Sequence, residues 1–234
     1  MIRPSAIVFD YGGTLVESEE CKFESGIDKL LSISVNPNNV TTNEIIEAFC
    51  KLDNEINIIN QVYMIEASFR NYYRYVFEKF NITFTNTYEQ LEGIFRREIF
   101  TYKPTEGILD FLNYLQNNQI RIGILSNNEF SGEVLSQEIK ELLPGLNFEF
   151  VISSTDYYFR KPSPKIFEIA KSKMNLCGDK IWYVGDSFDA DVLGAAHADM
   201  TPVWYNQFKN KRSENEKYME AVSWLELQKY IETL

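Results

Sequence analysis

The sequence of 234 residues predicts an α/β fold, a doubly wound parallel sheet interrupted by an inserted helical segment. From residue 104 onward, short apolar runs alternate with amphipathic stretches of helical length, which is typical of right-handed βαβ units. One more apolar run, Ala6–Phe9, indicates a further strand of the same sheet near the N-terminus. We therefore expect an α/β core domain formed by residues 1–16 and 104–234, and a separate domain formed by residues 17–103.

Within the core, each expected strand is a short apolar run and each expected helix is a longer amphipathic stretch. The later strands are expected over Ile120–Leu125, Phe148–Ser153, Ile181–Val184 and Pro202–Tyr205. The helices between and around them are expected over Ile108–Leu115, Ser131–Leu142, Pro164–Met174 and Ala190–Ala198. A last helix begins at Ser223, which is expected to form a capping box with Glu226. This alternation predicts a sheet covered by helices on both faces.

The segment from residue 17 to 103 shows three helical stripes. The first follows a capping box at Thr41–Glu44 and carries Ile45, Phe49, Leu52, Ile56 and Ile59. The second carries Val62, Ile65, Phe69, Tyr73, Val76 and Phe80, and the third carries Leu91, Ile94, Phe95 and Ile99. The run Ile82–Phe84 is too short to predict a strand. We therefore expect an all-helical insertion with a small core of its own.

Composition narrows the class of protein. Hydrophobic residues make up 44% and aromatic residues 15% of the chain, which is typical of a globular protein. The net charge of −11 argues against binding to nucleic acid or to an anionic membrane surface. The three cysteines, Cys21, Cys50 and Cys177, have no metal-like spacing and are expected to be reduced, partly buried thiols. With no room for a signal peptide before the first strand and no apolar run of transmembrane length, we expect a cytoplasmic protein.

Four polar stretches follow four of the expected strands. They are Asp10-Tyr11-Gly12-Gly13-Thr14, Ser126-Asn127-Asn128, Lys161-Pro162 and Gly185 to Asp191. Since ligands of open α/β sheets bind at the carboxyl ends of the strands, we expect these stretches to converge on one crevice. The two glycines allow a sharp turn that brings backbone N–H groups close to an anion. Each stretch alone fits a turn, a helix cap or a solvated loop, but their joint placement favours a site.

In order and spacing, these stretches resemble the four motifs of the haloacid dehalogenase-like hydrolase superfamily. Those motifs are D-x-D-G-T after the first strand, a Ser or Thr after the second, a Lys, and G-D-x-x-x-x-D. The resemblance covers about Ile2–Val16 and Pro104–Leu234, and the insertion lies where the family places its helical cap. It implies a phosphatase-type hydrolase that acts on a small phosphorylated metabolite.

The resemblance also implies roles for individual residues. Asp10 is expected to be the nucleophile and to form an aspartyl-phosphate. A Mg²⁺ ion relieves the repulsion between this carboxylate and the phosphate, held by Asp10, the backbone carbonyl of Gly12, and Asp186. Asp191 supports the water shell of the metal or orients Lys161.

A second set of residues is expected to bind the phosphate. Ser126 and the backbone of Asn127 donate hydrogen bonds to phosphate oxygens, and Gly13 and Thr14 belong to the turn that faces the anion. Lys161 neutralises charge on both the nucleophile and the phosphoryl group. These residues give an acidic protein a locally positive site.

Position 12 departs from the family pattern. Phosphatases of the family carry a second Asp there, which acts as general acid and then general base, whereas this chain has Gly12. General acid–base help is worth ~10²–10⁴-fold in rate, about 3–5 kcal/mol of barrier. Alkyl phosphates should therefore react slowly, and acyl phosphates or phosphoanhydrides should suffer less. Glu17, just after the first motif, is a candidate substitute proton donor.

Three alternatives to a phosphatase stay open. Dehalogenases of the family carry Tyr at position 12 and lose the Gly-Asp metal motif, but this chain keeps Gly185-Asp186 and has Tyr11 one position away. Phosphonate hydrolases use a cap lysine, for which Lys51 is a candidate. The third alternative is a degenerate relative that binds phosphate or a protein partner without turnover.

Further charged residues have two interpretations. Arg70 and Arg74 lie one turn apart in the insertion and either bind a second anionic group of the substrate or form a solvated helix face. His197 is the only histidine of the chain, and a packing or surface role is expected for it.

Overall fold

The computed structural model describes residues 2–211 and 217–234, and in these ranges the core contains one six-stranded sheet in the order β10-β9-β8-β1-β6-β7. Its strands are β1 (Ala6–Phe9), β6 (Arg121–Ser126), β7 (Val151–Ser153), β8 (Ile181–Gly185), β9 (Thr201–Tyr205) and β10 (Met219–Ala221). All neighbouring pairs are parallel, with β1 between β6 and β8. The predicted parallel α/β fold is confirmed.

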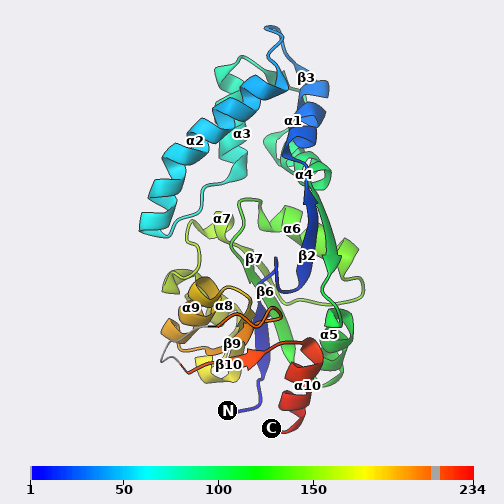
Figure 1. Ribbon diagram of the computed structural model, residues 1–234, viewed down its shortest axis with the longest axis vertical. Helices are drawn as coiled ribbons and strands as arrows, with labels where there is room; N and C mark the ends of the chain where they lie inside the picture. The colour runs from blue at the N-terminus through cyan, green and yellow to red at the C-terminus, as the bar shows by residue number, and fades with distance from the viewer. Residues whose placement is uncertain (1, 212–216) are drawn as a thin grey trace.

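Helices cover both faces of this sheet (Figure 1). One face carries α5 (Ile108–Asn117), α6 (Gly132–Leu142) and α10 (Trp224–Glu232), and the other carries α8 (Pro164–Met174) and α9 (Leu193–His197). In β1, Ile7 and Phe9 pack into the first layer while Ala6 and Val8 pack into the second. Because successive side chains of a strand point to opposite faces, a strand buried on both sides must be continuously apolar. This is the pattern that identified the strands in the sequence.

The insertion forms a helical layer above the core (Figure 1). Its elements are β2 (Val16–Cys21), α1 (Phe23–Ser32), β3 (Ser34–Val35), α2 (Thr42–Tyr63), α3 (Phe69–Lys79), β4 (Thr83–Phe84), α4 (Tyr88–Ile99) and β5 (Phe100–Pro104). An aromatic cluster lies at the centre of this layer, with the rings of Phe69 and Tyr73 only 4.3 Å apart and edge to face. The capping box of Thr41 and Glu44 is present at the start of α2.

The expectation of an all-helical insertion is wrong. β2 and β5 pair as an antiparallel ribbon that joins the insertion to the core, and β3 pairs with β4 (Figure 1). β2 reads Val-Glu-Ser-Glu-Glu-Cys and is mostly exposed, so it lacks the apolar alternation by which a strand is found in a sequence. Pairing between segments distant in the chain creates this ribbon.

Several expected elements have different bounds. The helix that contains Phe69 and Tyr73 includes neither Val62 nor Ile65, because α2 continues to Tyr63 and ends at Met64 in a left-handed conformation. The strand expected from Phe148 begins only at Val151, and the helix expected over Ala190–Ala198 is a π-helical turn, Phe188–Val192, followed by α9.

Two smaller expectations also need correction. Ser223 accepts a hydrogen bond from the Glu226 N–H, but the Glu226 carboxylate accepts from Val222 instead of Ser223, so the reciprocal capping box is incomplete. Cys21, Cys50 and Cys177 are free thiols but exposed, not partly buried. Within residues 2–211 and 217–234, none of the helices combines the length and the hydropathy that a membrane span requires.

The loop after β6 joins the two layers. Phe130 of this loop is 2% exposed and packs into the aromatic cluster of the insertion, with its ring centroid 5.0 Å from that of Phe69. The backbone carbonyl of Glu129 accepts a hydrogen bond from the Phe69 N–H. The buried Glu92 of α4 accepts hydrogen bonds from the backbone N–H and the hydroxyl of Ser131. The insertion is therefore attached to the core by this loop as well as by the β2–β5 ribbon.

Removal of the Phe130 ring should destabilise the protein. A Phe130→Ala substitution leaves a cavity between the layers, and we expect it to lower the free energy of unfolding by about 3 kcal/mol, measured by urea denaturation. The control is Tyr75→Ala, which removes a side chain that is 54% exposed and should change the value by less than about 0.5 kcal/mol. Equal effects of the two substitutions would contradict the role given to Phe130.

Candidate active site

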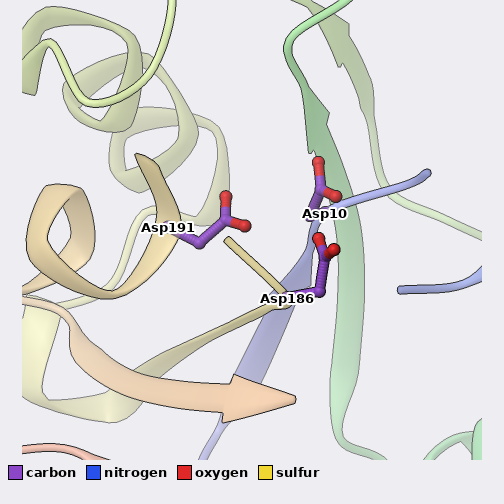
Figure 2. Close-up of side chains that lie close together, drawn as sticks. All are labelled: Asp10, Asp186 and Asp191. Atoms are coloured by element: carbon purple, nitrogen blue, oxygen red, sulfur yellow. The ribbon is translucent and has the colours of Figure 1, made fainter. Parts of the chain in front are cut away.

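Three carboxylates meet at the carboxyl ends of the central strands (Figure 2). Asp10 follows β1, Asp186 follows β8, and Asp191 lies in the π-helical turn beyond it. One oxygen of each can be chosen so that all three lie within 4.8 Å of one another. Asp10 and Asp191 are buried, whereas Asp186 is exposed. The convergence expected from the strand order therefore holds for these residues.

Lys161 lies between two of these carboxylates. Its Nζ donates hydrogen bonds to Asp10 Oδ1 and Asp191 Oδ1, both at 2.6 Å, and to the Tyr183 hydroxyl at 2.8 Å. Lys161 is 4% exposed, so its charge is almost fully removed from water. The three carboxylates and one ammonium sum to a charge of −3 + 1 = −2. This residual charge makes the site complementary to a divalent cation.

The pKa values of this group reflect burial and mutual attraction. Burial raises the pKa of Asp10, attraction to Lys161 opposes the rise, and the Asp191 charge adds to it. Burial alone would lower the pKa of Lys161, but the Asp10 and Asp191 carboxylates raise it above its usual value. Lys161 therefore keeps its proton, and the nucleophile candidate faces a fixed positive charge.

Two further contacts hold Lys161 in place, and neither was foreseen in the sequence. The side-chain amide of Asn127 donates to the Lys161 carbonyl at 2.9 Å and accepts from its N–H at 2.7 Å. The Tyr183 hydroxyl, which accepts from Lys161, donates to the carbonyl of Leu125 at 2.9 Å. Tyr183 lies inside an apolar strand, where an aromatic residue is usual, so its sequence position carried no functional signal.

The two glycines of the turn after β1 differ in whether a side chain could replace the glycine hydrogen. Gly13 has a φ of +79°, and a Cβ there would lie 2.5 Å from Asp186 Oδ2. Its N–H donates to the Val16 carbonyl at 2.8 Å. Gly12 is exposed, and a Cβ there would meet no atom within 4 Å. Glycine is thus required for conformation at position 13 but not at position 12.

Thr14 and Ser126 occupy different places in the site. Thr14 is fully buried, and its hydroxyl lies 3.5 Å from both Asp10 Oδ2 and Asp186 Oδ1, so it supports the carboxylates from behind. Ser126 is 4% exposed and lines the cavity in front of Asp10, together with Asn127 and Lys161.

A cavity of about 610 Å³ connects this group with the insertion. The core contributes to its wall Asp10, Tyr11, Gly12, Ser126, Asn127, Asn128, Glu129, Phe130, Arg160, Lys161, Asp186, Ser187, Ala190 and Asp191. The insertion and its β5 edge contribute Asp53, Asn57, Asn60, Glu66, Ala67, Tyr72, Arg96, Phe100 and Tyr102. The candidate nucleophile therefore lies at the bottom of a cavity whose opposite wall is formed by α2, α3 and the segment between them.

Most other residues singled out in the sequence lie outside the cavity wall, although Tyr11 is part of it. Among the residues that the structure describes, the cavity wall includes neither Lys51 nor Glu17. Arg70 forms ion pairs with Glu89 and Glu92, and Arg74 with Glu78. His197 is exposed at the end of α9, and the Tyr11 hydroxyl donates to Glu138 at 2.6 Å. The arginines thus form ion pairs within the insertion, and of the two roles expected for His197, packing or surface, the structure shows the surface one.

Alanine substitutions at Gly13 and Gly12 should show which glycine is required by its backbone conformation and which can be replaced because a side chain would have open space. Gly13→Ala forces a left-handed conformation on an L side chain and displaces Asp186, so we expect a loss of ~1–2 kcal/mol in the free energy of unfolding. Gly12→Ala should change it by less than about 0.5 kcal/mol, because the Cβ enters open space. Thermal and urea denaturation of both variants measures the difference, and a more harmful Gly12→Ala would refute it.

Two curated proteins match part of this sequence. A protein from Methanothermobacter thermautotrophicus named glyceraldehyde 3-phosphate phosphatase is 30% identical over 106 residues, 44% of this chain and 45% of that protein. The pyrimidine 5'-nucleotidase YjjG of Escherichia coli is 28% identical over 114 residues, 47% of this chain and 48% of that protein. The chain thus spans about half the length of the curated relatives that it matches.

A solved structure and a family model also match this chain. A solved structure of a HAD phosphatase from Thermococcus onnurineus superposes with a TM-score of 0.57 and 22% identity, covering 97% of each chain. The family model described as haloacid dehalogenase-like hydrolase matches residues 4–199, which contain all four motifs. The chain belongs to the haloacid dehalogenase-like hydrolases.

Proposed function

We propose that the protein is a Mg²⁺-dependent phosphatase that transfers the phosphoryl group of a small phosphorylated metabolite to Asp10. The observation that carries the proposal is the buried Lys161 held at 2.6 Å from both Asp10 and Asp191, with Asp186 beside them. Family membership supports hydrolysis, and the partial matches to proteins named as phosphatase and nucleotidase support a phosphate ester as substrate.

The donor set of the site fits a magnesium ion. Its ligand candidates are hard carboxylate oxygens, and its net charge is −2 without a cation. Asp10 and Asp186 would hold the ion with the backbone carbonyl of Gly12. Asp191 has another task, because its Oδ1 accepts from Lys161 and its Oδ2 accepts from the Ser187 N–H. When bound, the ion supplies positive charge that offsets the repulsion between nucleophile and phosphate.

The chain's own residues account for the rest of the reaction. An Asp10 oxygen attacks phosphorus, the bond to the leaving-group oxygen breaks, and water later hydrolyses the aspartyl-phosphate at phosphorus. The Lys161 ammonium stabilises charge on the transferring phosphoryl group. Ser126 and the Asn127 N–H would donate to its oxygens, and Asn127 and Tyr183 hold Lys161 in place throughout. Residues 1–16 and 104–234 form the catalytic domain in this proposal, and residues 17–103 form a cap that limits access of water.

Gly12 determines which phosphates react well. No side chain at this position can protonate a leaving group, although there is space for one. Esters with poor leaving groups should therefore turn over slowly. This same observation favours the second candidate function, a relative that binds phosphate without turnover.

The first test measures phosphate release from a panel of sugar phosphates, nucleotides, acyl phosphates and an aryl phosphate with Mg²⁺. Asp10→Asn should abolish turnover because it removes the nucleophile. Gly12→Asp should raise turnover of alkyl esters by ~10²-fold or more, since it restores a general acid in open space. Wild-type protein that releases no phosphate from any compound, alongside an active Gly12→Asp variant, would instead establish the binding relative.

The second test concerns the metal. Binding of Mg²⁺ to the folded protein should stabilise it by about 2.7 kcal/mol when the ion is present at a hundred times its dissociation constant. Asp186→Asn should greatly reduce this stabilisation, measured by thermal unfolding with and without Mg²⁺. Asp110→Asn removes an exposed carboxylate of α5 and serves as the control. An unchanged Mg²⁺ effect in Asp186→Asn would reject the metal assignment.

A further inference from the structure

The part of the cavity that faces the insertion has an excess of negative charge. Asp53 of α2, Glu66 and Glu129 line it, and the cations on the same wall are Arg96 and Arg160. Arg96 forms an ion pair with Glu138, with atoms 3.0 Å apart, and its guanidinium lies against the rings of Phe100, Tyr102 and Phe130. Arg160 pairs with Glu66 at 3.4 Å. Each arginine is therefore already matched by a carboxylate.

Two carboxylates of this wall have no cationic partner among the described residues. Asp53 accepts hydrogen bonds only from the neutral side chains of Asn57 and Tyr72, at 3.0 and 3.3 Å. The Glu129 carboxylate accepts no hydrogen bond within the described part of the chain, although its backbone is fixed to α3. A ligand group placed here would meet two carboxylates that form no ion pair with the described residues.

Asn60 gives independent evidence that this wall binds something. Asn60 lines the cavity and is only 4% exposed, and within residues 2–211 and 217–234 its side-chain amide makes no hydrogen bond. This amide is not one of the fully buried polar groups that lack a partner, so it is open to the cavity. An amide that is open to a cavity and has no protein partner can be hydrogen-bonded by water or by a ligand. An unpartnered amide that faces a cavity is therefore complementary to a polar ligand.

An aromatic recess adjoins the same wall. It has a volume of about 310 Å³ and shares Asp53, Tyr72, Glu129 and Phe130 with the main cavity. Phe49 and Phe69 form its inner side, and their rings are stacked with centroids 5.6 Å apart. Aromatic faces next to unpaired carboxylates attract an organic ammonium group, through the ring quadrupole and through direct charge attraction.

We propose that Asp53, Asn60, Tyr72, Glu129 and Phe130 form an ammonium subsite, which binds a positively charged amine on the alcohol part of the phosphate ester. The inference rests on the proposed function, since it names the substrate class of the same cavity: phosphate monoesters of amino alcohols. A second anionic group on the substrate would face Asp53 and Glu129 and be repelled. Arg70 and Arg74 do not compensate, because both pair with glutamates outside the cavity.

The titration of Glu129 supports the subsite. Glu129 is exposed, but desolvation at the cavity wall, followed by the charges of Glu66 and Asp53, raises its pKa to about 7, while Arg96 and Arg160 oppose the rise. The carboxylate is therefore neutral below this pH and charged above it. A bound ammonium favours the charged form. Affinity for the amine should accordingly increase as the pH rises through about 7, and it should do so less in Glu129→Gln.

The test combines binding and turnover. Binding is measured by calorimetry with choline and with its carbon isostere, in which a quaternary carbon replaces the nitrogen. We expect wild-type protein to bind choline at least about tenfold more tightly than the isostere, and Asp53→Asn combined with Glu129→Gln to remove this preference. Glu47→Gln, an exposed α2 carboxylate outside the cavity, should keep it. Equal binding of choline and its isostere by wild-type protein would overturn the subsite.

Turnover separates this inference from the proposed function. Phosphate release is measured with phosphoethanolamine, phosphocholine, uncharged propyl phosphate and anionic phosphoglycolate. The subsite predicts the highest kcat/KM for the two amines and the lowest for phosphoglycolate, with the ratio of amine to propyl ester falling about tenfold in the double variant. If all four esters release phosphate with equal kcat/KM, the subsite is overturned and the proposed phosphatase activity stays supported. No release from these four esters or from the acyl and aryl phosphates of the panel, with choline preferred in calorimetry, overturns the phosphatase and leaves the subsite supported.

Discussion

The two ion pairs of the Lys161 ammonium, with Asp10 and Asp191, determine the electrostatics of the site. A lysine removed from water loses several kcal/mol of solvation, which only close opposite charges can offset. Here two carboxylates lie 2.6 Å from the same Nζ, so the lysine stays charged. Asp186 then leaves the group with a net negative charge, for which a divalent cation is the natural complement. In the proposed function, this acidic group would bind an anionic phosphate through Lys161 and the divalent cation together.

The loop after β6 links this chemistry to the insertion. The Asn127 side chain forms two hydrogen bonds with the backbone of Lys161. Phe130 packs into the aromatic cluster of the insertion, and Ser131 donates a hydrogen bond to the buried Glu92 of α4. Glu129 of the same loop faces the cavity. A displacement of the insertion should therefore shift Lys161 and the part of the cavity wall that contains Glu129 together.

The sequence predicts the core and the motif positions well, because both depend on local patterns. Continuous apolar runs mark strands buried on two faces, and the polar residues that end them lie where parallel strands place ligands. The contacts between the layers were not predictable in this way. Tyr183 resembles any strand residue, the exposed β2 gains its structure from β5, and Asp53 meets Glu129 only after the chain has folded. Each of these depends on partners distant in the chain, which periodicity does not reveal.

In the proposed function, Asp10 accepts the phosphoryl group. The direct measurement is acid quenching during turnover, followed by borohydride reduction and mass spectrometry of the peptide that contains Asp10. Reduction converts an aspartyl-phosphate into homoserine, so we expect homoserine at position 10 in wild-type protein quenched with substrate, and none without substrate. Steady phosphate release with an unmodified Asp10 in every quenched sample would contradict it, and would place the attacking group on water or on another side chain.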